Sequence, residues 1–512
     1  MIRAYSAQAI RDAEAPLLAA GQPLMLRAAQ ALAKHIADRL RSTASEELGG
    51  RDARVLVLAG SGANGGDGLH AAALLRREGI AADAIATAER LHEEGAAALR
   101  EAGGTITALT DTDTTPTMLE ERLATTALVL DAILGIGGRP EVPAALSPLL
   151  AVVRSSGVPV IAVDLPSFVD ATTGQAAPEA LVASGTVTFG ALKAGLLLPG
   201  GAERSGAVQL VDLGLSPHLT AAPTVLRLKD GDVRALLPRP DRDASKYTRG
   251  VVALAAGSVQ FPGAAVLAAS GAARTGAGMV RCLAPERVLD LVLRERPETV
   301  THPIAETVVD PEAIDLADLG RTDALVVGPG LAADDPRAAV GVDGLREGAG
   351  TLTRGVIDAG ALSVLTTEHR FGPDVVLTPH RGEAERLAKR LDIDPDLPGA
   401  QLAPLLARAT GATMLLKGAI TLIAPGDGGP LRAQDDATPQ LATAGTGDVL
   451  AGVLGTLLAA GLPGPDAAAL AAILHGRAGR RASREGRQPL VALDVAAHLP
   501  EAIGTILAGA QP

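Results

Sequence analysis

Short apolar runs rich in Val, Ile, Leu and Ala recur along this chain, separated by longer stretches rich in Ala, Leu and Arg. The runs do not alternate between apolar and polar residues, which is typical of strands buried on both faces. The first series of predicted strands comprises residues 55–59, 80–85, 127–130, 158–163, 186–189 and 208–211. The second comprises residues 251–255, 279–283, 324–327, 355–358, 375–377, 413–416 and 421–424. The pattern predicts two α/β blocks, the first with a parallel sheet covered by helices.

Two domains fit this pattern, because 512 residues are too many for one ordinary hydrophobic core. Residues 215–223 are the best linker candidate, since the segment is short and contains two prolines. We therefore predict domains at residues 1–218 and 219–512. Ahead of the first strand, residues 6–40 should form one or two amphipathic helices, broken near Gly21.

Composition excludes several classes of partner. The net charge is −12, and the only aromatic residues are 2 Tyr and 4 Phe, so we expect no nucleic-acid partner. The N-terminus has no apolar signal core, and the longest near-apolar stretch, 449–464, is too short to span a membrane. We therefore expect a cytoplasmic protein without a membrane partner, in which the single cysteine, Cys282, is a buried structural thiol. We also expect a homo-oligomer.

A glycine-rich segment, Gly60-Ser-Gly-Ala-Asn-Gly-Gly-Asp-Gly68, follows the first predicted strand and precedes a helical stretch. Glycine permits positive φ and close approach of a ligand to the backbone, and a helix start offers free N–H groups to an anion. A tight strand-to-helix turn is the structural alternative. Asn64 and Asp67 favour a ligand site, because they supply oxygen atoms for a hydroxyl group or a cation.

Two more predicted strands of the first block end in polar residues, at the edge where a parallel sheet binds its ligands. Asp131 ends one strand, and Asp164 and Ser167 follow another. An isolated Asp in such a place is usually a helix cap, but three polar strand ends in one block indicate a shared site. Asn64, Asp131 and Ser167 together could coordinate a monovalent or divalent cation through oxygen.

The motifs of this block resemble those of the YjeF N-terminal family, which are NAD(P)H-hydrate epimerases. They stand in the family's order at residues 63–68, 131–137, 164–168 and 186–195, the last reading TVTFGALKAG. The resemblance implies a Rossmann-like three-layer α/β/α sandwich, K⁺ bound by Asn64, Asp131 and Ser167, and a catalytic Asp164 at the reacting ring. It implies that the dinucleotide contacts Ala63, Asn64, Gly65, Gly66, Asp67, Gly135, Ile136, Gly137, Gly138, Arg139, Pro140, Glu141 and Asp164.

Three positions depart from the family's motifs: Ala63 replaces Asn, Ile136 replaces Thr, and Phe168 replaces Gly. Each replacement removes a polar contact or a flexible joint near the ligand. The fold and the ligand class still follow from the resemblance. The alternative for this block is a module that has lost catalysis and serves only in ligand binding or oligomerisation.

The strongest motif of the chain is Thr443-Ala-Gly-Thr-Gly-Asp-Val-Leu-Ala-Gly452, which opens an apolar helix. Gly445, Thr446 and Gly447 allow backbone N–H groups to converge at the helix N-terminus and form an anion hole. Asp448 stands at its mouth, placed to accept a proton from a hydroxyl group. An ordinary first-turn Asp is the structural alternative, although such a helix does not need two glycines around a threonine.

This motif resembles the ribokinase-like superfamily, and seven ordered elements across residues 224–505 resemble the ADP/ATP-dependent NAD(P)H-hydrate dehydratases. The resemblance implies a ribokinase-like α/β domain that uses Mg²⁺ and ADP or ATP. It implies hydrate contacts from Ala264, Gly330, His380 and Asp448, nucleotide contacts from Lys417, Gly418, Ala419, Ile420, Thr421 and Gly447, and Asp448 as catalytic acid/base. One departure is Gly360 in place of the family's Asp, which loses a carboxylate.

The two resemblances together imply a bifunctional enzyme that repairs hydrated nicotinamide nucleotides. The first block would interconvert the R and S epimers of NAD(P)H hydrate, and the second would dehydrate the S form at the expense of ADP or ATP. The alternative is a ribokinase-like small-molecule kinase fused to a non-catalytic ligand-binding domain, because the G-T-G-D motif alone fits it equally well.

Overall fold

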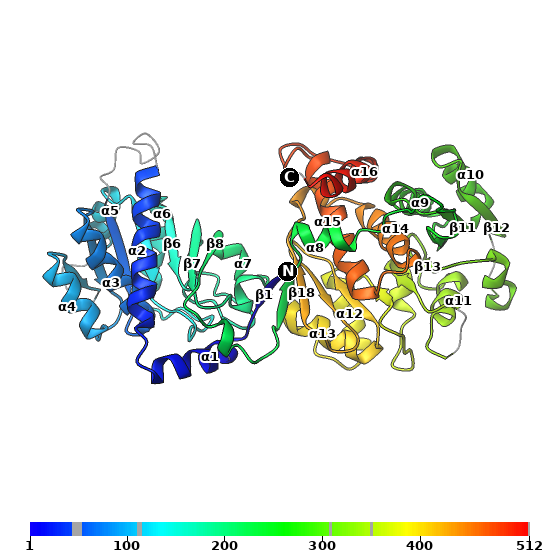
Figure 1. Cartoon of the computed structure of the whole chain (residues 1–512). Coiled ribbons are helices and arrows are strands. Elements are labelled where there is room, and N and C mark those ends of the chain that lie inside the picture. The colour runs from blue at the N-terminus through cyan, green and yellow to red at the C-terminus, as the bar shows by residue number, and fades with distance from the viewer. Residues whose placement is uncertain (43–53, 110–114, 307–309, 349–351, 510–512) are drawn as a thin grey trace. The chain divides into compact units, whose positions relative to one another are not determined.

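The buried apolar runs form two separate β-sheets in the computed structural model, which describes residues 1–42, 54–109, 115–306, 310–348 and 352–509 (Figure 1). The chain divides into two compact units. The N-terminal unit comprises residues 3–225, and the C-terminal unit comprises residues 226–512 together with the first two residues.

The N-terminal unit is built on a seven-stranded parallel sheet with the order β4-β3-β2-β5-β6-β7-β8. Its strands are β2 (Val55–Ala59), β3 (Ala82–Ala86), β4 (Ile106–Ala108), β5 (Leu128–Ala132), β6 (Val160–Val163), β7 (Gly185–Phe189) and β8 (Ala207–Val211). Its longer helices are α1 (Ala7–Ala19), α2 (Leu24–Ser42), α3 (Ala63–Arg77), α4 (Glu93–Glu101), α5 (Pro116–Ala124) and α6 (Ser147–Ser156). All six predicted strands are present, and α1 and α2 confirm the predicted helices and their break.

Helices cover both faces of this sheet, as the alternate residues of β2 show. Val55, Val57 and Ala59 pack in one buried cluster with residues of α2 and α3. Leu56 and Leu58 pack in a second cluster with residues of α5 and α6. The predicted three-layer α/β/α sandwich is therefore confirmed, with a sheet buried on both faces.

Helix α3 begins inside the glycine-rich segment, although the sequence predicts a loop as far as Gly68. The glycines of this segment do not adopt positive φ. A Cβ atom on Gly65 would lie 2.0 Å from the carbonyl oxygen of Gly60, and one on Gly68 would lie 2.6 Å from the Cβ of Ala132. The glycines therefore allow α3 to approach the sheet closely, and the interpretation that they serve for positive φ is wrong.

The C-terminal unit contains an eleven-stranded sheet with the order β1-β9-β18-β17-β16-β15-β14-β13-β10-β11-β12. Its strands are β1 (Ile2–Ala4), β9 (Val225–Arg227), β10 (Val251–Ala255), β11 (Met279–Pro285), β12 (Val300–Ile304), β13 (Ala324–Val327), β14 (Gly355–Ile357), β15 (Val375–Leu377), β16 (Thr413–Leu416), β17 (Thr421–Ala424) and β18 (Leu431–Gln434). Strands β16 to β12 are parallel along this order, whereas β17 runs antiparallel to both β16 and β18. All seven predicted strands are present.

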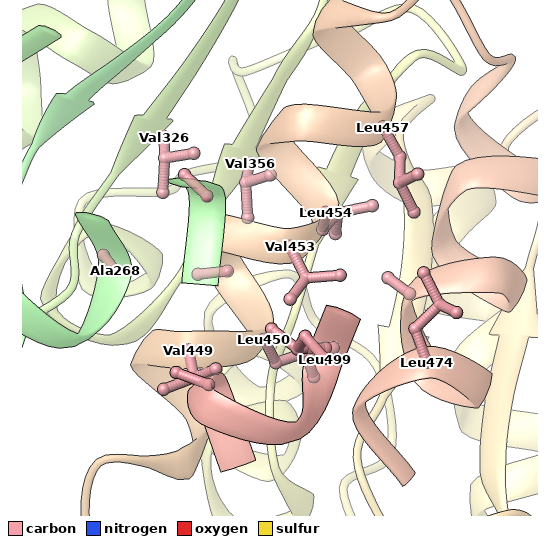
Figure 2. Close-up of a cluster of buried hydrophobic side chains, with 14 of the residues drawn as sticks. Ala268, Val326, Val356, Val449, Leu450, Val453, Leu454, Leu457, Leu474 and Leu499 are labelled. Carbon is pink, nitrogen blue, oxygen red and sulfur yellow. The ribbon is translucent and has the colours of Figure 1, made fainter. Parts of the chain in front are cut away.

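The described helices of this unit are α8 (Asp230–Leu236), α9 (Gly263–Thr275), α10 (Glu286–Glu295), α11 (Pro336–Gly344), α12 (Arg381–Arg390), α13 (Gly399–Thr410), α14 (Thr446–Ala459), α15 (Gly464–Ala482) and α16 (Ala492–Ala508). Figure 2 shows α14 in the core, with its apolar side chains among those of the sheet, α15 and α16. A Cβ atom on Gly452 would lie 2.0 Å from the carbonyl oxygen of Ala268 in α9. This close packing confirms a buried helix and holds its first turn at the carboxyl edge of the sheet.

Two further predictions concern Cys282 and membrane-spanning helices. Cys282 in β11 is fully buried, and burial raises the pKa of its thiol to about 12, which confirms a structural role. Across the described residues, no helix combines the length and apolar character that a membrane crossing requires.

Two candidate active sites

The first turn of α14 is fixed at the carboxyl edge of the sheet in the C-terminal unit. Gly445 precedes the helix with φ +88°, a left-handed conformation that favours glycine. Thr446 Oγ1 donates to the carbonyl oxygens of Leu441 (2.8 Å) and Thr443 (3.1 Å). The imidazole Nε2 of His475 donates to the carbonyl oxygen of Thr446 at 2.9 Å. The N–H groups at the start of α14 are thus held towards the space beyond the sheet edge.

Four charged side chains gather beside this turn. Asp358 and Lys417 directly follow the parallel strands β14 and β16, and Glu383 lies in the first turn of α12, which follows β15. Lys417 Nζ lies 3.0 Å from Asp358 Oδ1 and 3.8 Å from Glu383 Oε2, and Asp448 is the fourth charged residue. Burial, then repulsion by Asp358, raises the pKa of Asp448 to about 7, and Lys417 acts in the opposite direction. Asp448 can therefore change its protonation state at physiological pH, as a catalytic acid/base must.

A cavity of about 500 Å³ opens at the same place. Of the predicted residues, the following line it: His380, Lys417, Gly418, Ala419, Thr421, Thr446 and Gly447. The cavity wall does not include Ile420, which is buried, or Gly445 and Asp448, which lie at the start of α14 beside the cavity. His475 lines the cavity as well, and burial lowers the pKa of its imidazole to about 4, so the ring is neutral there. A largely apolar wall with a few polar groups is typical of a site for a nucleotide or similar ligand.

Ala264 and Gly330, which were predicted with His380 as hydrate contacts, do not line this cavity but lie next to each other. A Cβ atom on Gly330 would be 2.5 Å from that of Ala264, and Gly330 has φ +68°. The imidazole of His380 caps α12, because its Nδ1 accepts a hydrogen bond from Gly382 N at 3.1 Å, while the ring stays exposed. His380 therefore has a structural role as the cap of α12 in addition to its place in the cavity wall.

Close backbone packing explains why residue 360 is glycine and not the Asp of the family's motif. A Cβ atom on Gly360 would lie 2.1 Å from the carbonyl oxygen of Leu331, so the backbone here has no room for a side chain. In the described part of the chain, no group of three or more His, Cys, Asp or Glu side chains could hold a metal ion.

The three side chains predicted to bind K⁺ lie in the N-terminal unit. Ser167 Oγ donates to Asp131 Oδ1 at 2.5 Å, and Ser167 N donates to Asp131 Oδ2 at 2.8 Å. Asn64 is buried on α3 with neither side-chain oxygen nor nitrogen hydrogen-bonded, and a Cβ atom on Gly135 would lie 3.0 Å from Asn64 Oδ1. Burial raises the pKa of Asp131. An orphaned amide oxygen, a carboxylate and a hydroxyl are donors that suit a hard cation.

Asp164 follows β6 in a left-handed conformation with φ +68°, and its carboxylate forms a buried ion pair with Lys193. Asp164 Oδ1 also accepts hydrogen bonds from Thr188 Oγ1 (3.2 Å) and Phe189 N (3.4 Å). Phe168, at the family's glycine position, has φ +66° and a fully buried side chain. This position therefore has a left-handed conformation without glycine.

A cavity of about 420 Å³ lies between this turn and α3. The predicted dinucleotide-binding residues that line it are Ala63, Asn64, Asp67, Gly135, Ile136, Gly137 and Asp164. The predicted residues that do not line it are Gly65, Gly66, Gly138, Arg139, Pro140 and Glu141. Helices α1 and α2 add Glu14, Leu18, Leu24, Met25 and Ala28. An N-terminal segment, which is predicted only to lead into the block, therefore forms part of the cavity wall.

Five titratable residues of the two sites are not predicted as site residues by the sequence: Glu14, Lys193, Asp358, Glu383 and His475. Lys193 stands in the motif at residues 186–195, and Asp358 lies two residues before Gly360, so a charged residue next to glycine just after a strand is a signal that the sequence offers. Glu14 and His475 lie on helices, and the sequence offers no sign that these two helices reach the ligand cavities.

The geometry defines a class of protein: an α/β enzyme with a Rossmann-like unit and a ribokinase-like unit, each with a cavity that carries a few polar groups at the carboxyl edge of its sheet. Family models agree, since one described as NAD(P)H-hydrate dehydratase matches residues 252–501 and one described as YjeF-related protein N-terminus matches residues 21–195. The chain belongs to the family of bifunctional NAD(P)H-hydrate repair enzymes, as its relatives make plain.

One relative, the bifunctional NAD(P)H-hydrate repair enzyme Nnr of Mycobacterium leprae, is 39% identical over 98% of this chain and 99% of its own length. The enzyme of the same name from Mycobacterium tuberculosis is 40% identical over 91% of each chain. A crystal structure of the ADP/ATP-dependent NAD(P)H-hydrate dehydratase of Bacillus subtilis, co-crystallised with ATP and Mg²⁺, is 30% identical with a TM-score of 0.47. It covers 54% of this chain and 97% of its own. The alternative of a small-molecule kinase fused to a non-catalytic domain is not favoured.

Proposed function

We propose that this chain repairs hydrated NADH and NADPH through two sites. The C-terminal unit dehydrates the S epimer at the expense of ADP or ATP, and the N-terminal unit interconverts the R and S epimers. The observation that carries the proposal is the position of Asp448, which has a pKa of about 7 at the N-terminus of α14, beside a cavity lined by Lys417. A carboxylate there can take a proton while the helix N-terminus stabilises phosphate charge.

The proposed dehydration uses the kinase-like site to improve a leaving group. Hydration leaves a hydroxyl group on the ring carbon beside the nitrogen, and hydroxide leaves poorly. Asp448 accepts the hydroxyl proton as the oxygen attacks the terminal phosphorus of the nucleotide, whose bond to its bridging oxygen breaks. The lone pair of the ring nitrogen then expels phosphate, and loss of a proton from the adjacent carbon restores the double bond.

The nucleotide would occupy the cavity beside α14. Its terminal phosphate would accept hydrogen bonds from backbone N–H groups of Gly445, Thr446 and Gly447, and Lys417 would supply positive charge. Residues 418–421 would contact the rest of the nucleotide. Mg²⁺, when bound with the nucleotide, would neutralise phosphate charge.

The epimerase site would hold the hydrated ring at Asp164, with K⁺ bound by Asn64, Asp131 and Ser167. The orphaned amide of Asn64 and the adjacent oxygens of Asp131 and Ser167 support this donor set. When bound, K⁺ would offset the buried charge of Asp131 beside the ligand's phosphates. Asp164, anchored by Lys193, would face the ring carbon that carries the hydroxyl group.

The test mixes the protein with both epimers of hydrated NADH, with ADP or ATP and Mg²⁺, and follows the return of nicotinamide absorbance. Complete recovery of both epimers, faster from R than its spontaneous exchange, supports both activities and identifies the preferred nucleotide. Recovery of S alone removes the epimerase part of the proposal. No recovery, with a phosphorylated product from another small molecule, replaces the proposal with a kinase.

The remaining predictions concern the whole chain. We propose a domain boundary between residues 218 and 219, a homo-oligomer in solution and a cytoplasmic location. The single, buried cysteine supports a reducing compartment, and the charge of −12 argues against nucleic-acid partners. Light scattering coupled to size-exclusion chromatography tests the oligomeric state.

A further inference from the structure

The epimerase cavity contains more titratable groups than Asp164. Glu14 reaches it from α1, Asp67 from α3 and Asp164 from the turn after β6. Lys193 does not line the cavity but pairs with Asp164 from behind this turn. The three carboxyl groups at this small cavity cannot all be ionised beside one ammonium group, because like charges at close range disfavour one another.

Lys193 holds one oxygen of Asp164 and leaves the other free. Its Nζ is buried and donates to Asp164 Oδ1, to Thr188 Oγ1 at 3.1 Å and to the carbonyl oxygen of Phe189 at 2.8 Å. These bonds use all three donors of the ammonium group. The hydrogen bonds to the Asp164 carboxylate all fall on Oδ1, and Oδ2 has no hydrogen-bond partner among the described residues. One carboxylate oxygen is therefore available to a ligand in a fixed orientation.

Asp67 is in the opposite situation. Its Oδ1 is buried without a hydrogen-bond partner, although the side chain lines the same cavity. Burial, followed by repulsion from Asp164, raises the pKa of Asp67 well above its usual range; Glu14 acts in the same direction and Lys193 against it. A carboxyl group at a ligand cavity with a buried oxygen that lacks a partner, and with a pKa raised by its surroundings, is suited to carry a proton that it can donate to a ligand.

We infer that Asp67 and Asp164 form an acid–base pair for epimerisation, in which Asp67 donates a proton to the departing hydroxyl group and Lys193 positions Asp164. This inference rests on the epimerase function proposed above and deepens it. The two carboxyl groups come from different walls of the cavity, α3 and the turn after β6. Inversion at one carbon requires water to leave from one face of the ring and return at the other.

The proposed step needs no oxidant or reductant. Asp67 gives its proton to the hydroxyl oxygen, the carbon–oxygen bond breaks, water leaves, and the ring nitrogen's lone pair forms a carbon–nitrogen double bond. A water molecule then attacks the same carbon from the other face, and Asp164 takes its proton as the new bond forms. The proton returns from Asp164 to Asp67 through water, and in the reverse direction the two carboxyl groups exchange roles.

The first test uses the full-length chain and its dehydratase site as an internal control. Asp67→Asn should lower kcat for recovery from the R epimer about 100- to 10,000-fold, towards the spontaneous rate, because general acid catalysis is worth that much. Recovery from the S epimer should not change. Glu203→Gln, which removes an exposed carboxylate of the same unit, should leave both rates unchanged.

Other results of this test overturn parts of the scheme. An Asp67→Asn variant that keeps its kcat from R and only raises KM would make Asp67 a ligand contact and overturn the inference. If the wild-type protein recovers R no faster than spontaneous exchange, the proposed epimerase function itself fails, and this outcome is distinct because it appears before any substitution.

Lys193 is tested by a double-mutant cycle in the same assay. If Lys193 acts through Asp164, Lys193→Met lowers kcat from R in the wild-type background and has no further effect in an Asp164→Asn background. The pH dependence of kcat should also change in Lys193→Met. Additive losses, or an unchanged pH profile, would show that Lys193 does not position Asp164.

Thermal unfolding tests the proton on Asp67 without activity. Because the folded pKa of Asp67 is raised, its contribution to stability is complete below the unfolded pKa and is lost as pH rises through the folded pKa. Asp67→Asn has no such loss, so its unfolding temperature minus that of the wild type should increase from pH 5 to pH 9. A difference that does not change with pH would overturn the role of Asp67 as a proton donor.

Discussion

The two sites use the same parts, an aspartate and a lysine at the carboxyl edge of a parallel sheet, in opposite ways. In the N-terminal unit Lys193 pairs directly with the reacting carboxylate of Asp164. In the C-terminal unit Lys417 pairs with Asp358 instead, and Asp448 is left unpaired with a pKa of about 7. A base that must take a proton from a hydroxyl group benefits from a raised pKa, whereas the lysine beside Asp164 fixes the orientation of its carboxylate.

The two sites also differ in which residues adopt left-handed backbone conformations. The left-handed residue before α14 is a glycine, Gly445, whereas the turn after β6 places Asp164 and Phe168 in left-handed conformations. Non-glycine residues adopt such conformations at a cost of about 1–3 kcal/mol each, so the surrounding contacts must compensate. In the N-terminal unit those contacts are the ion pair to Lys193 and the buried ring of Phe168. The geometry of the N-terminal site therefore depends more strongly on the packing around it than the geometry of the C-terminal site does.

The largest expected effect is on the dehydratase reaction. Asp448→Asn removes the proton acceptor and should lower kcat for S-hydrate dehydration by about 1,000- to 10,000-fold, measured as the return of nicotinamide absorbance with ADP. Interconversion of R and S, followed by chromatography, should continue at the wild-type rate. Asp494→Asn, which changes an exposed carboxylate on α16, is the control and should leave dehydration unchanged. Loss of epimer exchange in Asp448→Asn would contradict the separation of the two sites.

The next effect separates the sites by stability. Asp164→Asn leaves the buried Lys193 without its carboxylate, and breaking a buried ion pair in this way costs about 3–5 kcal/mol. Asp448→Asn removes no ion pair, and because burial raises the folded pKa of Asp448, the substitution should make the C-terminal unit no less stable at pH 7 than the wild type. Denaturant unfolding monitored separately for each unit, for example by limited proteolysis, measures both. Equal losses from the two substitutions would contradict the comparison.

The sequence predicts most of the strands and helix starts that surround both sites, because these elements depend on local patterns. The strand at 55–59 is recovered from its apolar residues alone, and the start of α14 from its glycines. Strands β12 and β18 were not predicted because they read VTHPI and LRAQ, without an apolar run. Helix α3 begins earlier than predicted because its glycines serve close packing against the sheet rather than a loop.

The ion pairs of the two sites could not be predicted from local sequence patterns. Asp164 and Lys193 are 29 positions apart, and their contact depends on where two strands of the sheet end. Glu14 reaches the epimerase cavity only because α1 and α2 turn across it. Whether a lysine pairs with the reacting carboxylate or with its neighbour is decided by distances of a few ångströms, which no spacing in the sequence encodes.

The pH dependence of dehydration sharpens the comparison further. Asp448 accepts a proton only when ionised, so kcat/KM for the S hydrate should rise with pH through about 7. Asp358 raises the pKa of Asp448, and its removal also frees Lys417, which lowers it. In Asp358→Asn the rise should therefore occur at lower pH, and the ratio of variant to wild-type kcat/KM should be higher at pH 6 than at pH 8. A shift to higher pH would contradict this electrostatic scheme.

The smallest expected effect tests the left-handed turn. Phe168→Ala and Phe168→Gly both remove a buried ring, which costs about 3–5 kcal/mol. At an ordinary position glycine would be the less stable of the two variants, because it increases the entropy of the unfolded chain. At φ +66° the order should reverse, with Phe168→Gly more stable than Phe168→Ala by about 1 kcal/mol in denaturant unfolding. If the alanine variant is the more stable, the backbone at Phe168 is not strained. The N-terminal site then needs no packing energy to hold this turn, and the contrast with Gly445 disappears.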